Sequence, residues 1–201
     1  MKALYCFIIM SCFFIKNHAQ NNFVKLIESQ NVPVIIDGEL AEQEWLNAQE
    51  ILIKGITDRE VSVLLKYDTD NLYIAFRNLT DSQNINFNAE VLINTNTKES
   101  TWGEHCYWFH SSYGNCSAIG QYYYWDNCTT EPTGWIANTF PFKNGNNNME
   151  FKISFSKLNI TPKKGEQLKI AFKLSDPLEQ QVYWPDAAFI GDPLTWGLIE
   201  F

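Results

Sequence analysis

The chain has 201 residues, of which 45% are hydrophobic and 19% charged, and its formal net charge is -8. This length fits one domain, and the composition excludes a disordered chain and a coiled coil. Because an acidic chain without a basic patch binds phosphate backbones poorly, we expect no nucleic-acid partner. Aromatic residues reach 15%, with seven tryptophans, which is more than a core of this size needs.

The first residues have the pattern of an export signal. Lys2 gives a positive start, an apolar run follows over 4–15, and a short polar stretch ends at Ala19. We therefore predict a signal peptide at 1–19, cleaved after Ala19, and a mature domain at 20–201. The run is too short to span roughly 30 Å of hydrocarbon, and no other stretch is long enough, so no membrane span is expected. The protein is predicted to be exported, either secreted or periplasmic.

Short segments with an apolar–polar alternation follow one another along the mature chain. This pattern is typical of antiparallel strands with one buried and one wet face. Four segments alternate clearly and five more are further strand candidates; together, about nine short strands separated by turn signals predict an all-β fold, an antiparallel β-sandwich of jelly-roll-like form. The expected strands are 32–36, 50–56, 61–67, 72–78, 89–94, 106–111, 149–155, 168–174 and 196–201.

One short helix is expected at 39–47, directly after Asp37-Gly38. Glutamates in its first turns favour the positive end of the helix dipole, and Leu40 with Trp45 could pack against the sandwich. Residues 95–135 are interpreted as a long irregular insertion.

Three cysteines remain after the signal peptide, Cys106, Cys116 and Cys128. An odd number in an oxidising compartment predicts one disulfide and one free thiol, and three pairings are open. We favour Cys116 with Cys128, because both lie in a loop-like stretch that a bridge would help to order. Cys106 precedes an apolar strand and is expected to be a buried thiol. A zinc site is disfavoured because the CxxC spacing is missing.

Catalytic motifs are also missing. The sequence has no G-x-S-x-G, no H-E-x-x-H and no glycine-rich phosphate loop. A carboxylate pair for glycoside cleavage stays open, since 23 acidic residues could supply one, but no pair is singled out. His105 and His110 could act as bases or metal ligands, although at their spacing they do not share a strand face. No enzyme activity is assigned from the sequence.

Aromatic residues gather between Trp102 and Trp135 and again around Tyr183-Trp184-Pro185. Aromatic rings can lie on the apolar faces of sugars while a few polar groups bind the hydroxyls, so a saccharide is the expected ligand. We place the binding surface on loops, in the 95–135 insertion and at 183–193. Trp45, Trp108 and Trp196 are interpreted as core residues. The expected ligand-binding residues are Trp102, His110, Trp125, Trp135 and Trp184.

Five motifs, in order, resemble those of the family 9 carbohydrate-binding modules and their exported single-domain relatives. They are Ile36-Asp37-Gly38-Glu39-Leu40 with Glu44-Trp45, the hairpin at 63–76, the strand at 89–96, the strand at 165–172 and the closing segment at 193–201. The resemblance covers residues 32–201. It implies a β-sandwich, sugar binding and, often, structural calcium.

Two positions depart from the family pattern. The stretch 84–87 lacks the tryptophan that the sugar-binding modules carry before this strand, although Trp184 could match the late tryptophan of their pair. Asn94 stands in place of the usual aspartate. Because carboxylates raise calcium affinity, we expect at most one weak site, built from loop oxygens of Asn94, Asn96 and Glu99.

Two classes of function follow. The first is a non-catalytic carbohydrate-binding domain of an exported protein, which the absence of a nucleophile or metal motif favours. The alternative is a glycan-processing enzyme, or a structural or interaction protein, that keeps the fold without the sugar site. The missing tryptophan favours this alternative.

Overall fold

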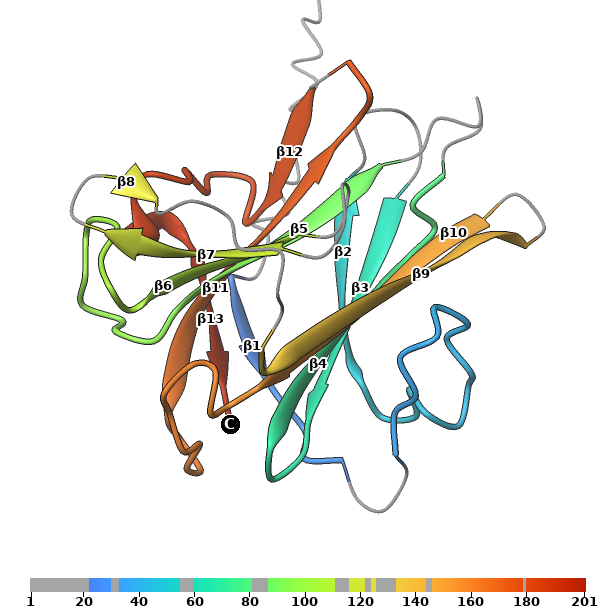
Figure 1. The fold of residues 1–201 in the computed structure, drawn as a ribbon, viewed down its shortest axis with the longest axis horizontal. Helices are drawn as coiled ribbons and strands as arrows, with labels where there is room; N and C mark the ends of the chain where they lie inside the picture. Colours follow the sequence, from blue (N-terminus) through green and yellow to red (C-terminus); the bar gives the residue numbers. More distant parts are fainter. Residues whose placement is uncertain are drawn as a thin grey trace, which may run out of the picture.

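The structure is a computed structural model that describes residues 22–29, 33–54, 60–80, 87–110, 116–121, 124–125, 133–143, 146–178 and 180–201. Two β-sheets pack against each other (Figure 1). The described chain is therefore an all-β sandwich, which confirms the predicted fold class. The signal peptide predicted at 1–19 lies outside the described residues.

The larger sheet has the order β1-β13-β11-β5-β6-β7-β8, and β12 also pairs with β11. The smaller sheet has the order β2-β3-β4-β10-β9. In the described chain, strands β1 and β13 pair in parallel. The other strand pairs of the two sheets are antiparallel. The strands of the larger sheet are β1 (Phe23–Lys25), β5 (Asn88–Asn94), β6 (Cys106–His110), β7 (Cys116–Gln121), β8 (Tyr124–Trp125), β11 (Gln167–Ser175), β12 (Gln181–Trp184) and β13 (Gly197–Glu200). Those of the smaller sheet are β2 (Gln49–Lys54), β3 (Glu60–Tyr67), β4 (Asn71–Arg77), β9 (Trp135–Lys143) and β10 (Asn146–Ser154).

The main core lies between the sheets and is built from alternate residues of their strands. Phe76 of β4 meets Phe151 of β10 and Phe172 of β11 edge to face, with ring centroids 5.9 and 5.5 Å apart. This geometry suits the ring quadrupoles. The inward alternation predicted for β3, β4, β10 and β11 is confirmed, because their inward residues belong to one buried cluster.

On the outer faces of both sheets, more side chains are buried than predicted. Glu150 on β10 and Lys173 on β11 should alternate into water, yet both are buried. Residues 33–48 cover part of the smaller sheet, and residues 185–196 cover part of the larger one. Each covering segment adds a small apolar cluster, so the sandwich carries buried surface outside its main core.

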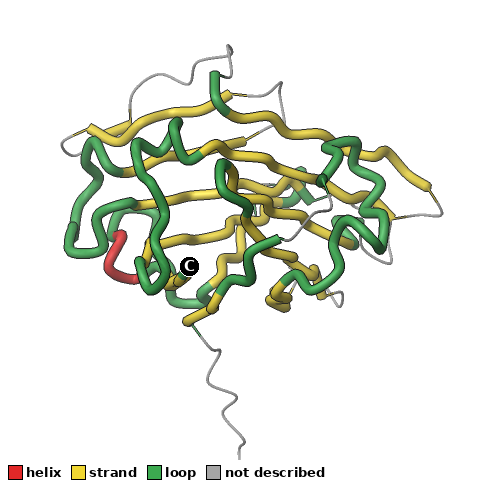
Figure 2. The backbone as a smooth tube through the Cα atoms, turned by 90° about the horizontal axis from the view of Figure 1, so that it is seen from below, coloured by secondary structure: helices red, strands yellow, loops and turns green. Residues whose placement is uncertain are grey.

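Residues 39–47 do not form the predicted helix. Residues 42–47 make successive turns, and the segment is bounded by Leu40 and Asn47, whose positive φ angles of 29° and 62° interrupt a helical repeat. Trp45 is nevertheless buried, as predicted, against the outer face of the smaller sheet. In the described chain, helix is confined to the single 3-10 turn η1 (Pro193–Thr195), drawn red in Figure 2. No helix in the described residues is long and apolar enough to cross a membrane.

Candidate ligand-binding site

Five side chains form a row across the outer face of the larger sheet. The strand register pairs Tyr183 with Lys173, Lys173 with Glu90, Glu90 with His110, and His110 with Cys116. Directly paired residues project from the same face of a sheet. Because the alternate residues of these strands, such as Phe172 and Val91, point into the core, these five point away from it. We call them the outer row.

A buried ion pair occupies the middle of the outer row. Lys173 Nζ lies 3.0 and 3.1 Å from the two carboxylate oxygens of Glu90. The two residues are only 9% and 7% exposed, so their attraction is less screened than at an open surface. Trp108 Nε1, from the neighbouring strand β6, donates a further hydrogen bond of 2.7 Å to Glu90 Oε2. Both carboxylate oxygens are therefore engaged.

Three half-buried rings surround this pair. Lys173 Nζ lies 5.4 Å from the centroid of the Trp108 ring, within the range of a cation–π contact. The His110 ring lies 5.5 Å from the Trp108 ring, and Tyr183 donates a hydrogen bond of 2.8 Å from its hydroxyl to Gln181 Oε1. The rings keep part of their surface exposed next to a fixed set of polar groups. Apolar rings beside a few fixed polar groups are typical of the lining of ligand-binding sites.

The charge state of the rings follows from burial. Burial lowers the pKa of His110, Glu90 opposes this shift and Lys173 adds to it, so the imidazole is neutral at pH 7. Burial, followed by the charge of Glu90, raises the pKa of Tyr183, and its hydroxyl stays protonated. The site therefore offers neutral rings around one paired cation and anion.

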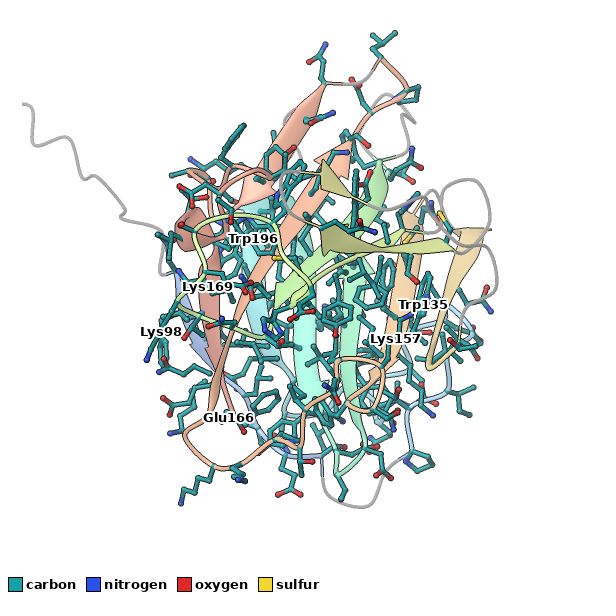
Figure 3. The ribbon with its side chains drawn as sticks, turned by 60° about the vertical axis from the view of Figure 1, so that its left-hand side comes forward. Lys98, Trp135, Lys157, Glu166, Lys169 and Trp196 are labelled. Atoms are coloured by element: carbon teal, nitrogen blue, oxygen red, sulfur yellow. The ribbon has the colours of Figure 1, made fainter. Side chains whose placement is uncertain are left out.

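The segment 185–196 borders the outer row. Its residue Trp196 is buried and packs with Leu92 and Ala171 on the sheet, next to the partly buried Trp108. Lys169 Nζ donates a hydrogen bond of 2.8 Å to the Leu194 carbonyl, and Figure 3 shows Lys169 close to Trp196. The sheet thus holds this segment through apolar contacts and through a cation at the end of η1.

Trp102 and His110, two of the residues predicted to bind the ligand, lie near this region, and their role in binding stays a prediction. Trp102 Nε1 donates to the carbonyl of Ile190, which joins the 95–135 insertion to the 185–196 segment. His110 belongs to the outer row itself. The side chain of Trp125 is outside the described residues, so its role stays a prediction.

Trp184 and Trp135 are core residues, which corrects their prediction as ring platforms. Trp184 is 0% exposed because β12 pairs with β11 and turns this ring inward, where it packs on Phe172 at 5.7 Å. Trp135 is 3% exposed and stacks on Phe151 at 6.2 Å. In Figure 3 it lies well away from Trp196. Neither ring can lie on a sugar without opening the sandwich.

Sequence reasoning missed Glu90, Lys173 and Trp108. Trp108 is not the core residue that the sequence predicts: Tyr107 and Phe109 on either side of it face the core, and period-two alternation places Trp108 on the other face. Glu90 and Lys173 likewise alternate with inward residues. The alternation within each strand shows that these side chains face outward. That Glu90 and Lys173 lie opposite each other depends on the register between β5 and β11, which the sequence does not show. Trp196 is buried as predicted, although in the smaller outer cluster.

The residues predicted to bind calcium lie close in sequence but make a poor donor set. Asn94 Oδ1 accepts a hydrogen bond of 2.7 Å from the Asn96 amide, and Asn96 Oδ1 accepts one of 3.2 Å from the Lys98 amide. Glu99 Oε2 is buried without a hydrogen-bond partner, and so is Asn94 Nδ2, which is a donor and repels cations. Calcium takes six to eight oxygens. Within the described ranges, no group of three His, Cys, Asp or Glu is placed to hold a metal. Calcium binding stays a prediction.

The described cysteines partly test the sulfur assignments. Cys106 is a free, buried thiol, as predicted, and burial raises its pKa to about 11. Cys116 Sγ lies 3.0 Å from His110 Nε2 at the end of the outer row. Cys128 lies outside the described residues, so the pairing of Cys116 with Cys128 stays a prediction.

The fold and the outer row together define a β-sandwich with a polar, ring-bordered outer face. No family model matches the chain, and no curated protein matches it. Among solved structures, it is similar to a carbohydrate-binding module of family 9 from Caldicellulosiruptor kristjanssonii in complex with cellotriose. The TM-score is 0.60 at 16% identity, over 89% of this chain and 92% of that chain.

Two further structures give the same result. The family 9 module of Caldicellulosiruptor kristjanssonii in complex with glucose has a TM-score of 0.60 at 16% identity, over 89% of this chain and 94% of that chain. A protein from Bacteroides uniformis that has been proposed to bind carbohydrate has a TM-score of 0.58 at 11% identity, over 90% of this chain and 99% of that chain. At these identities the likeness shows the fold. The chain therefore has the fold of the family 9 carbohydrate-binding modules, as the sequence motifs indicate.

Proposed function

We propose that the protein is a non-catalytic carbohydrate-binding domain and that its ligand lies on the outer row. The observation that carries this proposal is the buried Glu90–Lys173 pair with the half-exposed rings of Trp108, Tyr183 and His110 around it. Structures of the same fold bind cellotriose and glucose, which supports a saccharide as the ligand class.

The chemistry of the outer row suits sugar hydroxyls. Trp108 and Tyr183 supply ring faces for apolar C–H groups, and exposed rings that stack on a ligand bury surface that water would otherwise cover. The Lys173 ammonium has three N–H donors and retains capacity beyond Glu90 for a ligand hydroxyl. Neutral His110 can donate or accept through its imidazole.

The alternative of a glycan-processing enzyme finds little support in the outer row. Glycoside cleavage uses two carboxyl groups that flank the scissile bond. Among the described residues of the outer row, Glu90 is the single carboxylate, and Lys173 and Trp108 hold both of its oxygens. Binding without turnover is the function that this arrangement favours.

Calorimetric titration with a panel of neutral mono- and oligosaccharides, including glucose and cellotriose, tests the proposal. Trp108→Ala should weaken binding about tenfold or more, as expected from the transfer energy of a stacked aromatic side chain. Phe23→Ala is the matched control, because it removes a partly exposed ring on β1, away from the outer row, and should leave affinity unchanged. Failure of the wild type to bind any saccharide would reject the function.

We also propose that the chain is exported after cleavage near Ala19 and that Cys116 pairs with Cys128. The charged, apolar and polar order of the first residues supports export. The free thiol of Cys106 supports a bridge between the other two mature cysteines. Intact mass of the exported protein should place its start at Gln20, and thiol titration after denaturation without reductant should give one thiol. Three thiols would reject the bridge.

A further inference from the structure

The outer row carries one cation and one anion, and the rows on either side of it carry uncharged side chains. The next outward-facing row on one side consists of Gln181, Ser175 and Asn88, and the row on the other side consists of Ala171, Leu92, Trp108 and Ala118. In these three rows of described residues, Glu90 is the acidic and Lys173 the basic side chain. Their charges cancel.

Each charge of the pair is already satisfied. The Glu90 carboxylate accepts hydrogen bonds from Lys173 Nζ at 3.0 and 3.1 Å and from Trp108 Nε1 at 2.7 Å. The Lys173 ammonium is therefore paired with both carboxylate oxygens. A ligand carboxylate placed here would give up its hydration without gaining an unpaired cation. A ligand ammonium would likewise meet no unpaired anion. Because the pair is almost fully buried, the desolvation cost of either charged ligand is larger than it would be at an open surface.

We infer that the Glu90–Lys173 pair is the specificity device of this site. The pair selects uncharged saccharides. When one of its two charges is removed, the site should prefer a sugar whose charge is opposite to the charge that remains. This inference rests on the proposed function and adds to it the residues that set the ligand's charge.

The test compares three trisaccharides of similar shape. They are cellotriose, its form oxidised to carboxylate at C6, and the glucosamine trimer, which is cationic. The wild type should bind cellotriose at least about tenfold more tightly than either charged sugar. Glu90→Gln leaves Lys173 unpaired and should reverse the preference toward the carboxylated sugar. Lys173→Met should shift the preference toward the cationic sugar.

A single substitution leaves an unpaired buried charge and can destabilise the domain. The double variant Glu90→Gln with Lys173→Met removes both charges, and it should prefer the uncharged sugar as the wild type does. Thermal melting of each variant shows that the compared proteins are folded. Raising the salt concentration should weaken binding of the charged sugars to the single variants and leave cellotriose binding to the wild type unchanged.

The outcomes separate the two proposals. If the wild type binds no saccharide, the proposed function fails and the inference falls with it. If the wild type binds charged and uncharged sugars equally, or if Glu90→Gln keeps the wild-type preference, saccharide binding stands and the inference is wrong. A preference that follows the net charge of the pair across all four proteins confirms it.

Discussion

Tyr183 and Trp184 are neighbours in sequence, yet they serve opposite faces of one sheet. Tyr183 lies in the outer row, and Trp184 fills the core so tightly that a Cβ atom on Gly197 would lie 2.5 Å from its ring. The same aromatic chemistry therefore supports binding at one position and packing at the next. Which role a ring takes is decided by the β12–β11 pairing.

Trp184→Ala should lower the free energy of unfolding by about 3–5 kcal/mol, the usual cost of deleting a buried tryptophan. Urea unfolding monitored by circular dichroism measures it. Tyr183→Ala, one residue away on the outer face, is the control and should cost clearly less. Equal losses for both variants would mean that Trp184 is not a core residue.

Cys106 should be chemically inert in the folded protein. Its thiol is buried, and a pKa of about 11 keeps it protonated at pH 8, whereas the thiolate is the reactive form. Iodoacetamide should therefore leave Cys106 unmodified in native protein and alkylate it after denaturation, as peptide mass spectrometry will show. Rapid labelling of the native protein would contradict its burial.

Glu150 of β10 makes three of the hydrogen bonds that hold the covering segment 33–48 to the smaller sheet, beside those from Lys66 to the Glu44 carbonyl and from Asn138 to the Ile36 carbonyl. Glu150 Oε2 accepts hydrogen bonds of 3.0 and 2.6 Å from the amides of Asp37 and Gly38, and its Oε1 accepts one of 2.8 Å from Trp45 Nε1. Glu150 is fully buried beneath the segment. Together with the apolar contacts of Trp45, these bonds hold the turn-rich segment on the sheet without a helix.

Glu150→Ala should destabilise the domain by about 3 kcal/mol or more, because it leaves buried donors without an acceptor at about 1–3 kcal/mol each. The matched control is Glu50→Ala on edge strand β2, where the side chain is exposed. Hydrogen exchange should show faster exchange at the Asp37 and Gly38 amides in the first variant alone. Unchanged exchange there would mean that Glu150 does not hold the segment.

The same carboxyl group predicts a pH dependence. Burial raises the pKa of Glu150 above its ordinary value of 4.5, against the opposing hydrogen bonds from Gly38, Trp45 and Asp37. The folded state therefore binds this proton more tightly than the unfolded state, and falling pH favours folding through this group until the pH reaches 4.5. The stability of the wild type relative to Glu150→Gln should rise between pH 7 and pH 5 in urea titrations. A relative loss of stability on acidification would show that the hydrogen bonds outweigh burial.

At the scale of the whole molecule, the sequence predicted the inward faces better than the outward ones. Period-two alternation depends on local geometry, so strands β3, β4, β10 and β11 could be predicted residue by residue. Burial of the outer faces depends on segments that return from elsewhere in the chain, such as 185–196. The outer row requires the register of strands as distant as β5 and β11, which alternation does not specify. Short strands such as β12 carried too little pattern to place Trp184.

Calcium should contribute little to the stability of the whole domain. Glu99 Oε2 is the buried carboxylate oxygen without a partner among the predicted ligands, and one such oxygen makes a weak site. Chelator should lower the melting temperature by less than about 3 °C, which corresponds to roughly 1 kcal/mol in a domain of this size. Excess calcium should restore the original value. A fall of many degrees would reveal a strong site.

The outer row also limits which strand pairings the chain can adopt during folding. A slip of one residue in β5 or β11 would turn Glu90 or Lys173 into the space between the sheets and expose the apolar residues of that strand. A lone buried charge costs on the order of several kcal/mol. A slip of two residues keeps the faces but separates the cation from its carboxylate. The ion pair thus penalises misaligned sheets more than it stabilises the aligned one, because a buried pair adds little net stability but an unpaired buried charge is costly.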